Sequence, residues 1–386
     1  QARAIARREG ADTYPTLDAS ASAQRTERDG PRDTDQLNLG ATVSYEVDLW
    51  GRVEAGSDAA RLDAKARRSD LRAAAIALSA NVARTWYSLT EARARRDLVD
   101  QQLETNRKVL KAVEARFRQG LANAADVLRQ QQLVDRRSGD LARIDGLIDT
   151  RANELAVLMG KVPKQVDLPK RRELVTLSPI PDTGVPARLL QRRPDVRQSF
   201  FAVQAADRRV AVALANRYPR LDLTASFDTT ATSIGALFQT WIAQTAAQLG
   251  QPLFDAGRRK AEVNRSKAVL SERLNQYEDS ILTALREVED ALADERATRR
   301  EVESLTKQQQ TAEAVVQRLR SRYARGATDF LDVLDSLTSQ QDVARRLLAA
   351  RRDLILARVE LARALAGGWR LQAPDQSRAG IKEDAT

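Results

Sequence analysis

Cysteine and histidine are both absent from this sequence of 386 residues. Their absence excludes thiol nucleophiles, histidine general bases and metal sites built from these two residues, which removes many enzyme mechanisms. A chain without cysteine fits an oxidising compartment that is used without disulfides, and it also fits many cytosolic proteins. Aromatic residues make up only 4% of the chain, and no apolar run approaches the ~20 residues that a membrane-spanning helix needs.

Basic residues are in excess, but they are not concentrated in one region. The 63 lysines and arginines are interleaved with 53 aspartates and glutamates, which leaves a formal charge of +10. No arginine-rich run is punctuated by aromatic residues in the manner of a nucleic-acid-binding segment. We therefore interpret the charges as solvated faces of amphipathic helices and expect no nucleic-acid partner.

Proline is distributed unevenly. Six of the eleven prolines lie between Pro163 and Pro194, whereas none occurs in residues 32–162 or 253–373. Because a proline inside a helix costs about 3 kcal/mol, its absence from these two spans allows very long helices. The proline-rich middle of the chain is predicted to be a connector.

The two proline-free spans are copies of each other at a constant offset of 206 residues. No insertion is needed over more than 100 residues, so the chain carries an internal duplication. The aligned pairs are LWGR at 49–52 with DAGR at 255–258, RFRQG at 116–120 with RYARG at 322–326, and DVL at 126 with DVL at 332.

Each copy is predicted to form a long antiparallel hairpin of two helices. In the second copy, apolar residues recur at spacings of three and four, which marks one face of a helix. A helix over residues 258–323 would be ~100 Å long, which favours coiled-coil packing over a globular core. Gly120 and Gly326 interrupt the pattern where a chain reversal fits.

Strand pairs are predicted before each long hairpin. In LNLGATVSYEVDL, at residues 37–49, every odd position is apolar or small and every even position is polar or glycine. Such alternation predicts a strand with two different faces. Alternation also occurs at 14–22 (YPTLDASAS) and 218–228 (beginning YPRLDLTAS) and, more weakly, at 241–253. Polar loops at 29–36 and 233–238 would join the strands into hairpins.

The alternation by itself fits a soluble sandwich as well as a membrane barrel. Residues 37–49 would extend ~43 Å, which is enough to cross a bilayer at a tilt, and no further apolar segment is present to cover the apolar faces. Because free sheet edges are not tolerated in lipid and four strands cannot close alone, several chains would have to share one barrel.

Taken together, these features resemble the TolC-like outer-membrane efflux channel family, the outer-membrane factors of tripartite efflux systems. The motifs occur in the family's order over almost the whole chain. They are the doubled RxxxG and DVL turns, LLQRRPDVR at 189–197, YPRLDLTASF at 218–227, PLFDAGRR at 252–259 and LARALAGGW at 361–369.

The resemblance implies a mainly α-helical fold with β-strands, in which three identical chains form one channel. Four strands from each chain would make a twelve-stranded transmembrane β-barrel in outer-membrane lipid, and the helical hairpins would make an α-barrel across the periplasm. The implied partners are a periplasmic adaptor (membrane fusion) protein and an inner-membrane pump. The channel would pass drugs, metals or other small molecules passively, with no catalytic residue, cofactor or resident metal.

The resemblance also divides the chain into segments. They are a truncated N-terminal helix (1–13), a first β-hairpin (14–51), a first helical hairpin (52–160) with its tip near 118–124, an equatorial connector (161–193), a helix (194–217), a second β-hairpin (218–257), a second helical hairpin (258–366) with its tip near 324–330, and an equatorial or disordered tail (367–386). Many family members begin with a lipidated cysteine. The chain has no cysteine and starts at Gln1, so we expect a truncated N-terminus. Whether the native protein is lipidated is a separate question that the sequence does not decide.

Asp332 and Asp335 lie three residues apart in FLDVLDSL and therefore on one face of a helix. From the sequence alone they fit a pair of solvated carboxylates. The resemblance implies a second interpretation, a pore aperture at the periplasmic entrance lined by both residues of every chain. Carboxylates crowded in a narrow opening would raise one another's pKa, favour cations and trap multivalent ones.

Tyr323 and Asp126 match positions that, in the family, tie the two hairpins together as an entrance latch. The alternative is a tyrosine that packs between helices and an aspartate at a helix N-terminus. Thr328 stands where some members carry an arginine, which puts part of that latch in doubt.

Gly120, Leu121 and Gly326 match the helical tips that dock onto the adaptor. They are also ordinary turn residues, and both interpretations can hold together. Leu121 is the more informative of the three, because a turn is expected to be polar.

Two other functions compete with a channel. A soluble coiled-coil scaffold would have no use for the alternating segments, which is the feature that separates it from a channel. An enzyme, such as a carboxylate-dependent hydrolase, is disfavoured because the sequence offers no histidine, no cysteine and no convergent acid pair other than Asp332 and Asp335.

Overall fold

The computed structural model describes residues 1–27, 34–165, 167–169, 171–177 and 192–366. About half of the predicted connector (residues 166, 170 and 178–191) and the whole predicted tail lie outside these residues. The chain divides into two compact units, one of Gln1–Arg72 with Arg193–Thr283 and the other of Ala73–Arg192 with Ala284–Thr386. None of the helices in the described part of the chain is long and apolar enough to span a bilayer.

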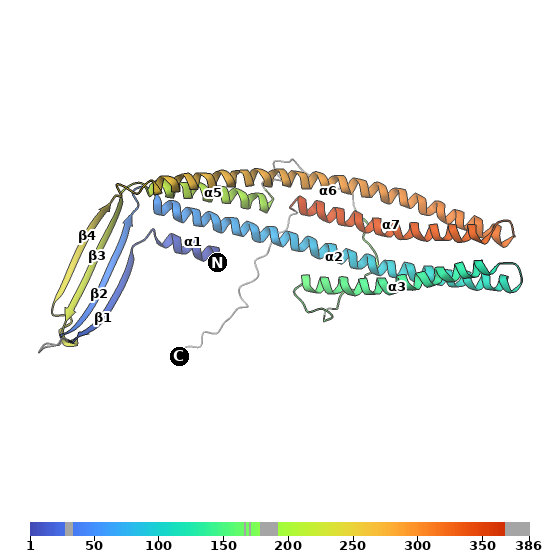
Figure 1. Cartoon of the computed structure of the whole chain (residues 1–386), viewed down its shortest axis with the longest axis horizontal. Helices are drawn as coiled ribbons and strands as arrows, with labels where there is room; N and C mark the ends of the chain where they lie inside the picture. Colours follow the sequence, from blue (N-terminus) through green and yellow to red (C-terminus); the bar gives the residue numbers. More distant parts are fainter. Residues whose placement is uncertain (28–33, 166, 170, 178–191, 367–386) are drawn as a thin grey trace. The chain divides into compact units, whose positions relative to one another are not determined.

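The first unit contains a four-stranded antiparallel sheet in the order β1-β2-β3-β4 (Figure 1). The two hairpins of the sheet come from the two halves of the duplicated chain, and they meet where β2 pairs with β3. The strands are β1 (Thr16–Thr26), β2 (Thr34–Val47), β3 (Arg220–Ala231) and β4 (Trp241–Gly250). The helices α1 (Ala2–Ala11) and α5 (Pro194–Ala215) belong to the same unit, as does the short η1 (Ile234–Ala236) between β3 and β4.

The register of the sheet places most apolar residues opposite apolar residues, with Thr229 and Thr245 as polar members of apolar rows and Ile242 as an apolar member of a polar row. One row runs through Ala19, Ala41, Phe227 and Ala243. The next row, on the opposite face, runs through Asp18, Thr42, Ser226 and Gln244. Since successive side chains of a strand point to opposite faces, the prediction of four strands with one apolar and one polar face is confirmed.

Several strand ends differ from the sequence prediction. β2 begins at Thr34, inside the predicted loop 29–36, and β1 and β3 run on to Thr26 and Ala231, beyond the predicted stretches 14–22 and 218–228. Two other ends fall short. β2 ends at Val47 rather than at residue 49, because Asp48 turns to accept a hydrogen bond from the Glu54 amide (2.8 Å), which starts the helix that follows. β4 ends at Gly250 rather than at residue 253, and the next residue but one is Pro252, which has no amide hydrogen to donate to a strand partner.

The long helices repeat at the spacing of the duplication. α2 (Arg52–Arg118) and α6 (Arg258–Ala324) both have 67 residues, and α3 (Ala124–Leu158) and α7 (Phe330–Ala364) both have 35. Each pair of helices begins 206 residues apart. At the rise of an α-helix, α2 and α6 are each ~100 Å long, so the predicted length is confirmed.

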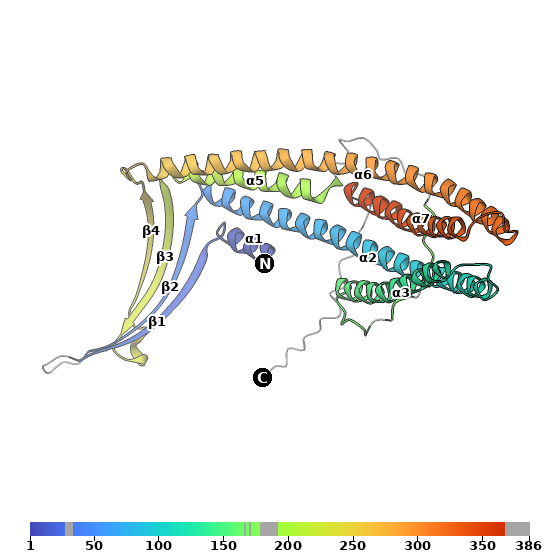
Figure 2. The same cartoon turned by 45° about the vertical axis from the view of Figure 1, so that its right-hand side comes forward.

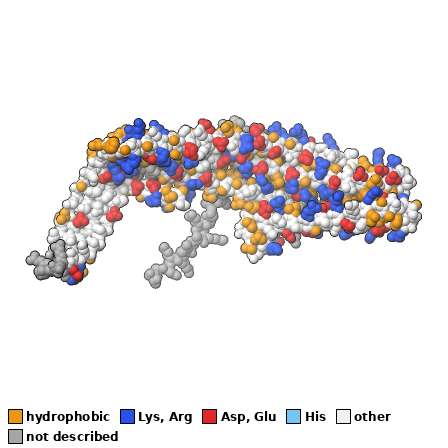
Figure 3. Space-filling model, viewed as in Figure 1, with side chains coloured by type: hydrophobic (Ala, Val, Ile, Leu, Met, Phe, Trp, Pro, Cys, Tyr) orange, Lys and Arg blue, Asp and Glu red, His pale blue; other side chains and the backbone are white. Residues whose placement is uncertain are grey.

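In the second unit, α3 runs beside α2 and α7 runs beside α6, in both views of the molecule (Figures 1 and 2). Each hairpin has its own apolar clusters. Leu103, Leu110 and Val134 pack together in the first hairpin, and Leu305, Leu347 and Ala350 pack together in the second. On the face drawn in Figure 3, lysine and arginine alternate with aspartate and glutamate over the helices, as expected for solvated helix surfaces.

Candidate pore entrance and the contacts between the helical hairpins

Asp332 and Asp335 lie in the first two turns of α7, and both side chains are exposed. Their neighbours Phe330 and Val333 are each 4% exposed, so the buried side of α7 is fixed and the two carboxylates face away from it. Thr328 donates a hydrogen bond to Asp332 (2.5 Å). The residue that stands in the place of a family arginine therefore orients one of the two predicted aperture carboxylates.

Both hairpin tips turn on a glycine with left-handed backbone, Gly120 and Gly326, each with φ of 72°. The first tip is closed by a hydrogen bond from the Leu121 amide to the Arg116 carbonyl (2.9 Å), and the second by the corresponding bond from Ala327 to Arg322 (2.9 Å). This is the arrangement that ends many helices with glycine. The two tips therefore have the same backbone, as the duplication predicts.

Leu121 is 61% exposed at the first tip, and two further leucines, one shortly after each tip in the sequence, are also exposed. They are Leu128, at 68%, and Leu331, at 52%. The sequence analysis did not single out these two. The structure thus places a predicted docking residue at the surface, with apolar surface on both hairpins, while docking itself stays a prediction.

Tyr323 contacts the first hairpin through its ring. The guanidinium carbon of Arg116 lies 4.4 Å from the centre of the Tyr323 ring, and Phe330 packs against the same ring at 5.7 Å. Within the described chain the Tyr323 hydroxyl is buried and has no hydrogen-bond partner.

Asp126 is 9% exposed and lies in the first turn of α3. Its amide donates to the Asn123 side chain, which caps the helix (2.9 Å), and its carboxylate lies 3.5 Å from Arg129. The structure therefore places Asp126 at a helix N-terminus without a bond to Tyr323. A latch between these two residues stays a prediction.

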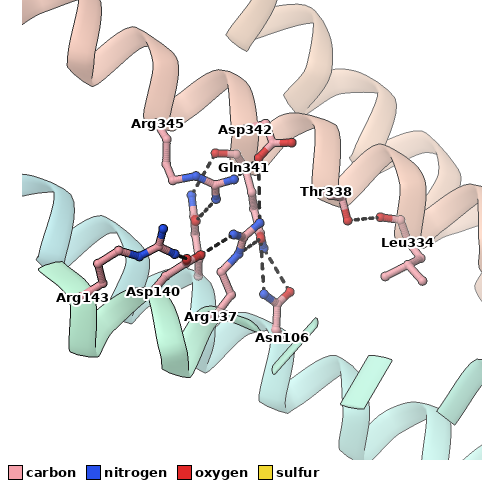
Figure 4. Close-up of polar contacts among 10 residues, drawn as sticks. Asn106, Arg137, Asp140, Arg143, Leu334, Thr338, Gln341, Asp342 and Arg345 are labelled. Atoms are coloured by element: carbon pink, nitrogen blue, oxygen red, sulfur yellow. Dashed lines mark hydrogen bonds and ion pairs between the residues drawn. The ribbon is translucent and has the colours of Figure 1, made fainter. Parts of the chain in front are cut away.

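A buried group of polar side chains joins the two hairpins at some distance from the tips (Figure 4). We call Gln102, Asn106, Gln130, Arg137 and Gln341 the inter-hairpin polar cluster, and none of the five is more than 6% exposed. The first two residues lie on α2, the next two on α3 and the last on α7. Sequence reasoning missed this cluster entirely.

Gln341 is the centre of the cluster. Its side-chain amide donates to Asn106 Oδ1 (3.0 Å), and its Oε1 accepts from Asn106 Nδ2 (3.3 Å) and from Arg137 Nε (3.4 Å). The Gln341 carbonyl accepts from the Gln102 side chain (3.2 Å). Gln130 donates to the Asn106 carbonyl (2.8 Å), so three helices are linked through one glutamine.

Charged residues surround the cluster (Figure 4). Arg137 pairs with Asp140 (2.9 Å), and Arg345 donates to Gln102 (2.7 Å) and pairs with Asp342. Burial and the nearby charge of Arg137 lower the pKa of Arg345 to about 10. Arg345 therefore still carries its charge at neutral pH.

Two buried glutamates form ion pairs with arginines. Glu91 on α2 lies 2.6 Å from Arg95 and 3.6 Å from Arg352 of α7, which adds a second polar link between the hairpins. Glu295 on α6 receives bonds of 2.7 Å from both Arg299 and Arg358. Burial raises the pKa of Glu295, but the bonds from Arg358 and Arg299 outweigh burial and hold that pKa below its ordinary value.

A duplicated chain with a four-stranded sheet that is apolar on one face, and two long helical hairpins, defines a subunit of the outer-membrane channel class. The chain belongs to the outer membrane efflux protein family, which matches residues 1–161 and 185–367. The matched family is one of efflux proteins and not of enzymes, and it places the chain in the outer membrane.

Individual relatives and solved structures agree with this assignment. The toluene efflux pump outer membrane protein TtgI of Pseudomonas putida is 30% identical over 381 residues, which cover 95% of this chain and 80% of that protein. The cation efflux system protein CusC of Escherichia coli O6:H1 is 26% identical over 379 residues, which cover 96% and 81%. The structure of the outer-membrane channel OprN superposes with a TM-score of 0.88 at 25% identity, covering 95% of this chain and 85% of that one.

Proposed function

We propose that this protein is one subunit of a trimeric passive conduit that leads from the periplasm to the outside of the cell. The observation that carries the proposal is the aligned sheet, apolar on one face and polar on the other, which ends in two edge strands. The outer edges of β1 and β4 have no strand partner within the described chain. In lipid each unpaired backbone group costs several kcal/mol, so β4 of one copy pairs with β1 of the next and three copies close the barrel.

The polar face of the sheet then lines a water-filled lumen, as in barrels that conduct solutes. Asp332 and Asp335 of the three copies line the periplasmic aperture. Carboxylates in a narrow ring attract cations and bind multivalent cations most strongly. The chain itself supplies neither catalysis nor energy, and no cofactor is needed for passage.

The energy for export comes from a partner. We infer that the exposed leucines at the helical tips meet a periplasmic adaptor protein, which in turn is anchored to an inner-membrane pump. The relatives include a toluene efflux pump protein and a cation efflux system protein. Because their cargoes differ, we assign only the broad class of drugs, metals and other small molecules, selected by the pump.

The proposal is tested with the purified full chain in planar lipid bilayers. The wild-type protein is expected to form channels that submillimolar hexamminecobalt blocks from the periplasmic side. The double variant Asp332→Ala with Asp335→Ala is expected to conduct without block, because the trivalent complex loses the negative charges that attract it. A matched control removes two exposed carboxylates from the middle of α6, Asp290→Ala with Asp294→Ala, and is expected to leave the block unchanged.

Two results would overturn the proposal. Block that persists in the aperture variant would show that these carboxylates do not line the narrowest opening. Protein that is monomeric in buffer without detergent, and forms no channels, would instead favour the soluble scaffold.

A further inference from the structure

Helix α7 carries both the predicted aperture and the central residue of the inter-hairpin polar cluster. Asp335 and Asp332 are six and nine residues from Gln341, which along an α-helix is ~9 Å and ~14 Å. α7 is continuous over this stretch. Any shift or rotation of α7 at Gln341 therefore moves the two carboxylates with it.

Polar contacts join α7 to the first hairpin, among them an ion pair between Glu360 of α7 and Arg84 of α2. The apolar clusters lie within one hairpin or the other, as described above. Between the hairpins, α7 is bound through Gln341, Arg345 and Arg352, which reach Asn106, Gln102 and Glu91 respectively. Directional bonds of this kind specify one position of a helix, whereas an apolar surface tolerates sliding.

The cluster occupies core positions of the coiled coil, where apolar residues are the rule. Asn106 lies in a seam of spacing four and three whose other members, Val99, Leu103, Leu110 and Val113, are all buried. Gln130 and Arg137 occupy the same kind of seam on α3, beside Val134. A single buried polar residue at such a position fixes register at the expense of stability.

The cluster also breaks the internal symmetry of the chain. At the offset of 206 residues, Asn106 corresponds to Ala312 and Arg137 corresponds to Val343. The duplicated copy thus has small or apolar residues at these two positions. The bonds that Asn106 and Arg137 make to Gln341 therefore have no counterpart at the repeat positions, although Gln102 and Gln130 correspond to the polar residues Gln308 and Ser336.

We propose that the inter-hairpin polar cluster is the positioning site of the pore aperture, with Gln341 as the residue that Asn106 and Arg137 hold in place. The cluster fixes the register of α7 against α2 and α3, and through α7 it sets how closely Asp332 and Asp335 approach their copies in the trimer. The inference rests on the proposed function and adds the residues that set the opening of the aperture.

The test measures both block and position. Gln341→Ala and Asn106→Ala are each expected to raise the hexamminecobalt concentration for half block about tenfold and to increase conductance, since α7 loses its register. The double variant is expected to behave like either single variant, because both remove the same link. Gln308→Ala, an exposed glutamine of α6 that bonds only to Ser304 of its own helix, is the matched control with unchanged block.

A conservative variant separates positioning from a loss of folding. Gln341→Glu keeps the length of the side chain and the acceptor for Asn106 Nδ2, and it loses the donor to Asn106 Oδ1. In exchange it adds an ion pair with Arg137, whose Nε lies 3.4 Å from Oε1 of the glutamine. Its block is expected to stay within about twofold of wild type. Should Gln341→Ala fail to assemble, Asn106→Ala carries the test, because it leaves Gln341 in place.

The position of α7 is read directly with a spin label. The chain has no native cysteine, so Ser339→Cys on the exposed side of α7 supplies one label per subunit. Electron–electron distances between the three labels are expected to lengthen in Asn106→Ala and to stay unchanged in Gln308→Ala.

Unchanged distances and unchanged block in both alanine variants would overturn the inference. If at the same time the aperture variant of Asp332 and Asp335 lost block, the proposed function would stand and only the positioning role would fail. If the aperture variant kept its block, the proposed function would fail first.

Discussion

Arg116 of the first hairpin and Tyr323 of the second are in cation–π contact, with 4.4 Å between the guanidinium carbon and the ring centre. Neither Arg116 Nε nor the Tyr323 hydroxyl has a hydrogen-bond partner in the described chain. The ring, and not the hydroxyl, therefore makes the described contact between the hairpin tips. A partly desolvated contact of this kind is worth about 1 kcal/mol.

The first prediction follows from this contact. Tyr323→Phe is expected to leave channel conductance and thermal stability close to wild type, because phenylalanine keeps the aromatic face. Arg116→Ala and Tyr323→Ala are expected to raise the fraction of time that the channel is open, measured in planar bilayers. Phe117→Ala, at the exposed repeat position of Tyr323, is the control. If Tyr323→Phe opened the channel as much as Tyr323→Ala, the hydroxyl would be the latch, as the predicted pair with Asp126 requires.

The fold was largely predictable because the sequence shows both the repeat at 206 residues and the alternation of apolar and polar residues in the strands. The constant offset of 206 residues located both pairs of helices, and the two tip glycines marked their ends. The alternation over residues 37–49 predicted which side chains share a face of the sheet. The last two residues of this stretch, 48 and 49, were wrongly assigned to the strand. The Asp48 side chain instead accepts a hydrogen bond from the helix that follows, which periodicity does not reveal.

The candidate site was less predictable, for a physical reason. Asp332, Asp335 and Leu121 could be located by motif and turn chemistry, since their surroundings are local. The inter-hairpin polar cluster depends on which seam of α2 meets which seam of α7, which no local pattern specifies. The signal that could have found it is Asn106, a polar residue inside an otherwise apolar seam of spacing four and three.

The second prediction concerns the buried carboxylate of Glu295. Its folded pKa lies below the ordinary 4.5, so its contribution to stability is fully present above pH 4.5 and is lost as the pH falls through the lower folded value. Glu295→Gln keeps the size of the side chain but removes the charge that Arg299 and Arg358 share. We expect it to destabilise the protein by about 3 kcal/mol near neutral pH, because it leaves two arginines without a buried counter-charge.

Thermal unfolding across a range of pH checks this prediction. The difference in Tm between wild type and Glu295→Gln is expected to shrink as the pH is lowered from about 6 to about 3. Glu289→Gln, an exposed neighbour on the same helix, is the control and should show no such dependence. A difference that stayed constant over this range would mean that the charge of Glu295 does not stabilise the fold.

The third prediction uses two adjacent residues of β2 that lie on opposite faces of the sheet. Val43 pairs with Leu17 and Ala225 in an apolar row, whereas Ser44 pairs with Thr16 and Thr224 in a polar row. A lysine on a lipid-facing position costs about 2 to 4 kcal/mol near the membrane centre. Val43→Lys is therefore expected to reduce the yield of trimers in the outer membrane severalfold, while Ser44→Lys assembles normally and changes the conductance.

Gel mobility of unheated samples measures the amount of trimer in both variants. An equal loss in Val43→Lys and Ser44→Lys would contradict the assignment of the apolar face to lipid. A loss in Ser44→Lys alone would reverse it.

The fourth prediction concerns the apolar tip residue Leu121. Its side chain is 61% exposed, and the turn below it is held by backbone bonds that do not involve the side chain. Leu121→Asp is therefore expected to leave the Tm and the trimer close to wild type, because most of the side chain is exposed. It is expected to lower efflux at least tenfold in cells that supply the adaptor and pump, since a charge on an apolar docking surface must be desolvated without a partner.

Gly120→Ala at the neighbouring position strains a left-handed turn and lowers stability by about 1 kcal/mol, which separates damage to the turn from damage to the surface. Drug-susceptibility assays with the Tm measured in parallel distinguish the two, and a Leu121→Asp strain that exports as well as wild type would show that the adaptor binds elsewhere.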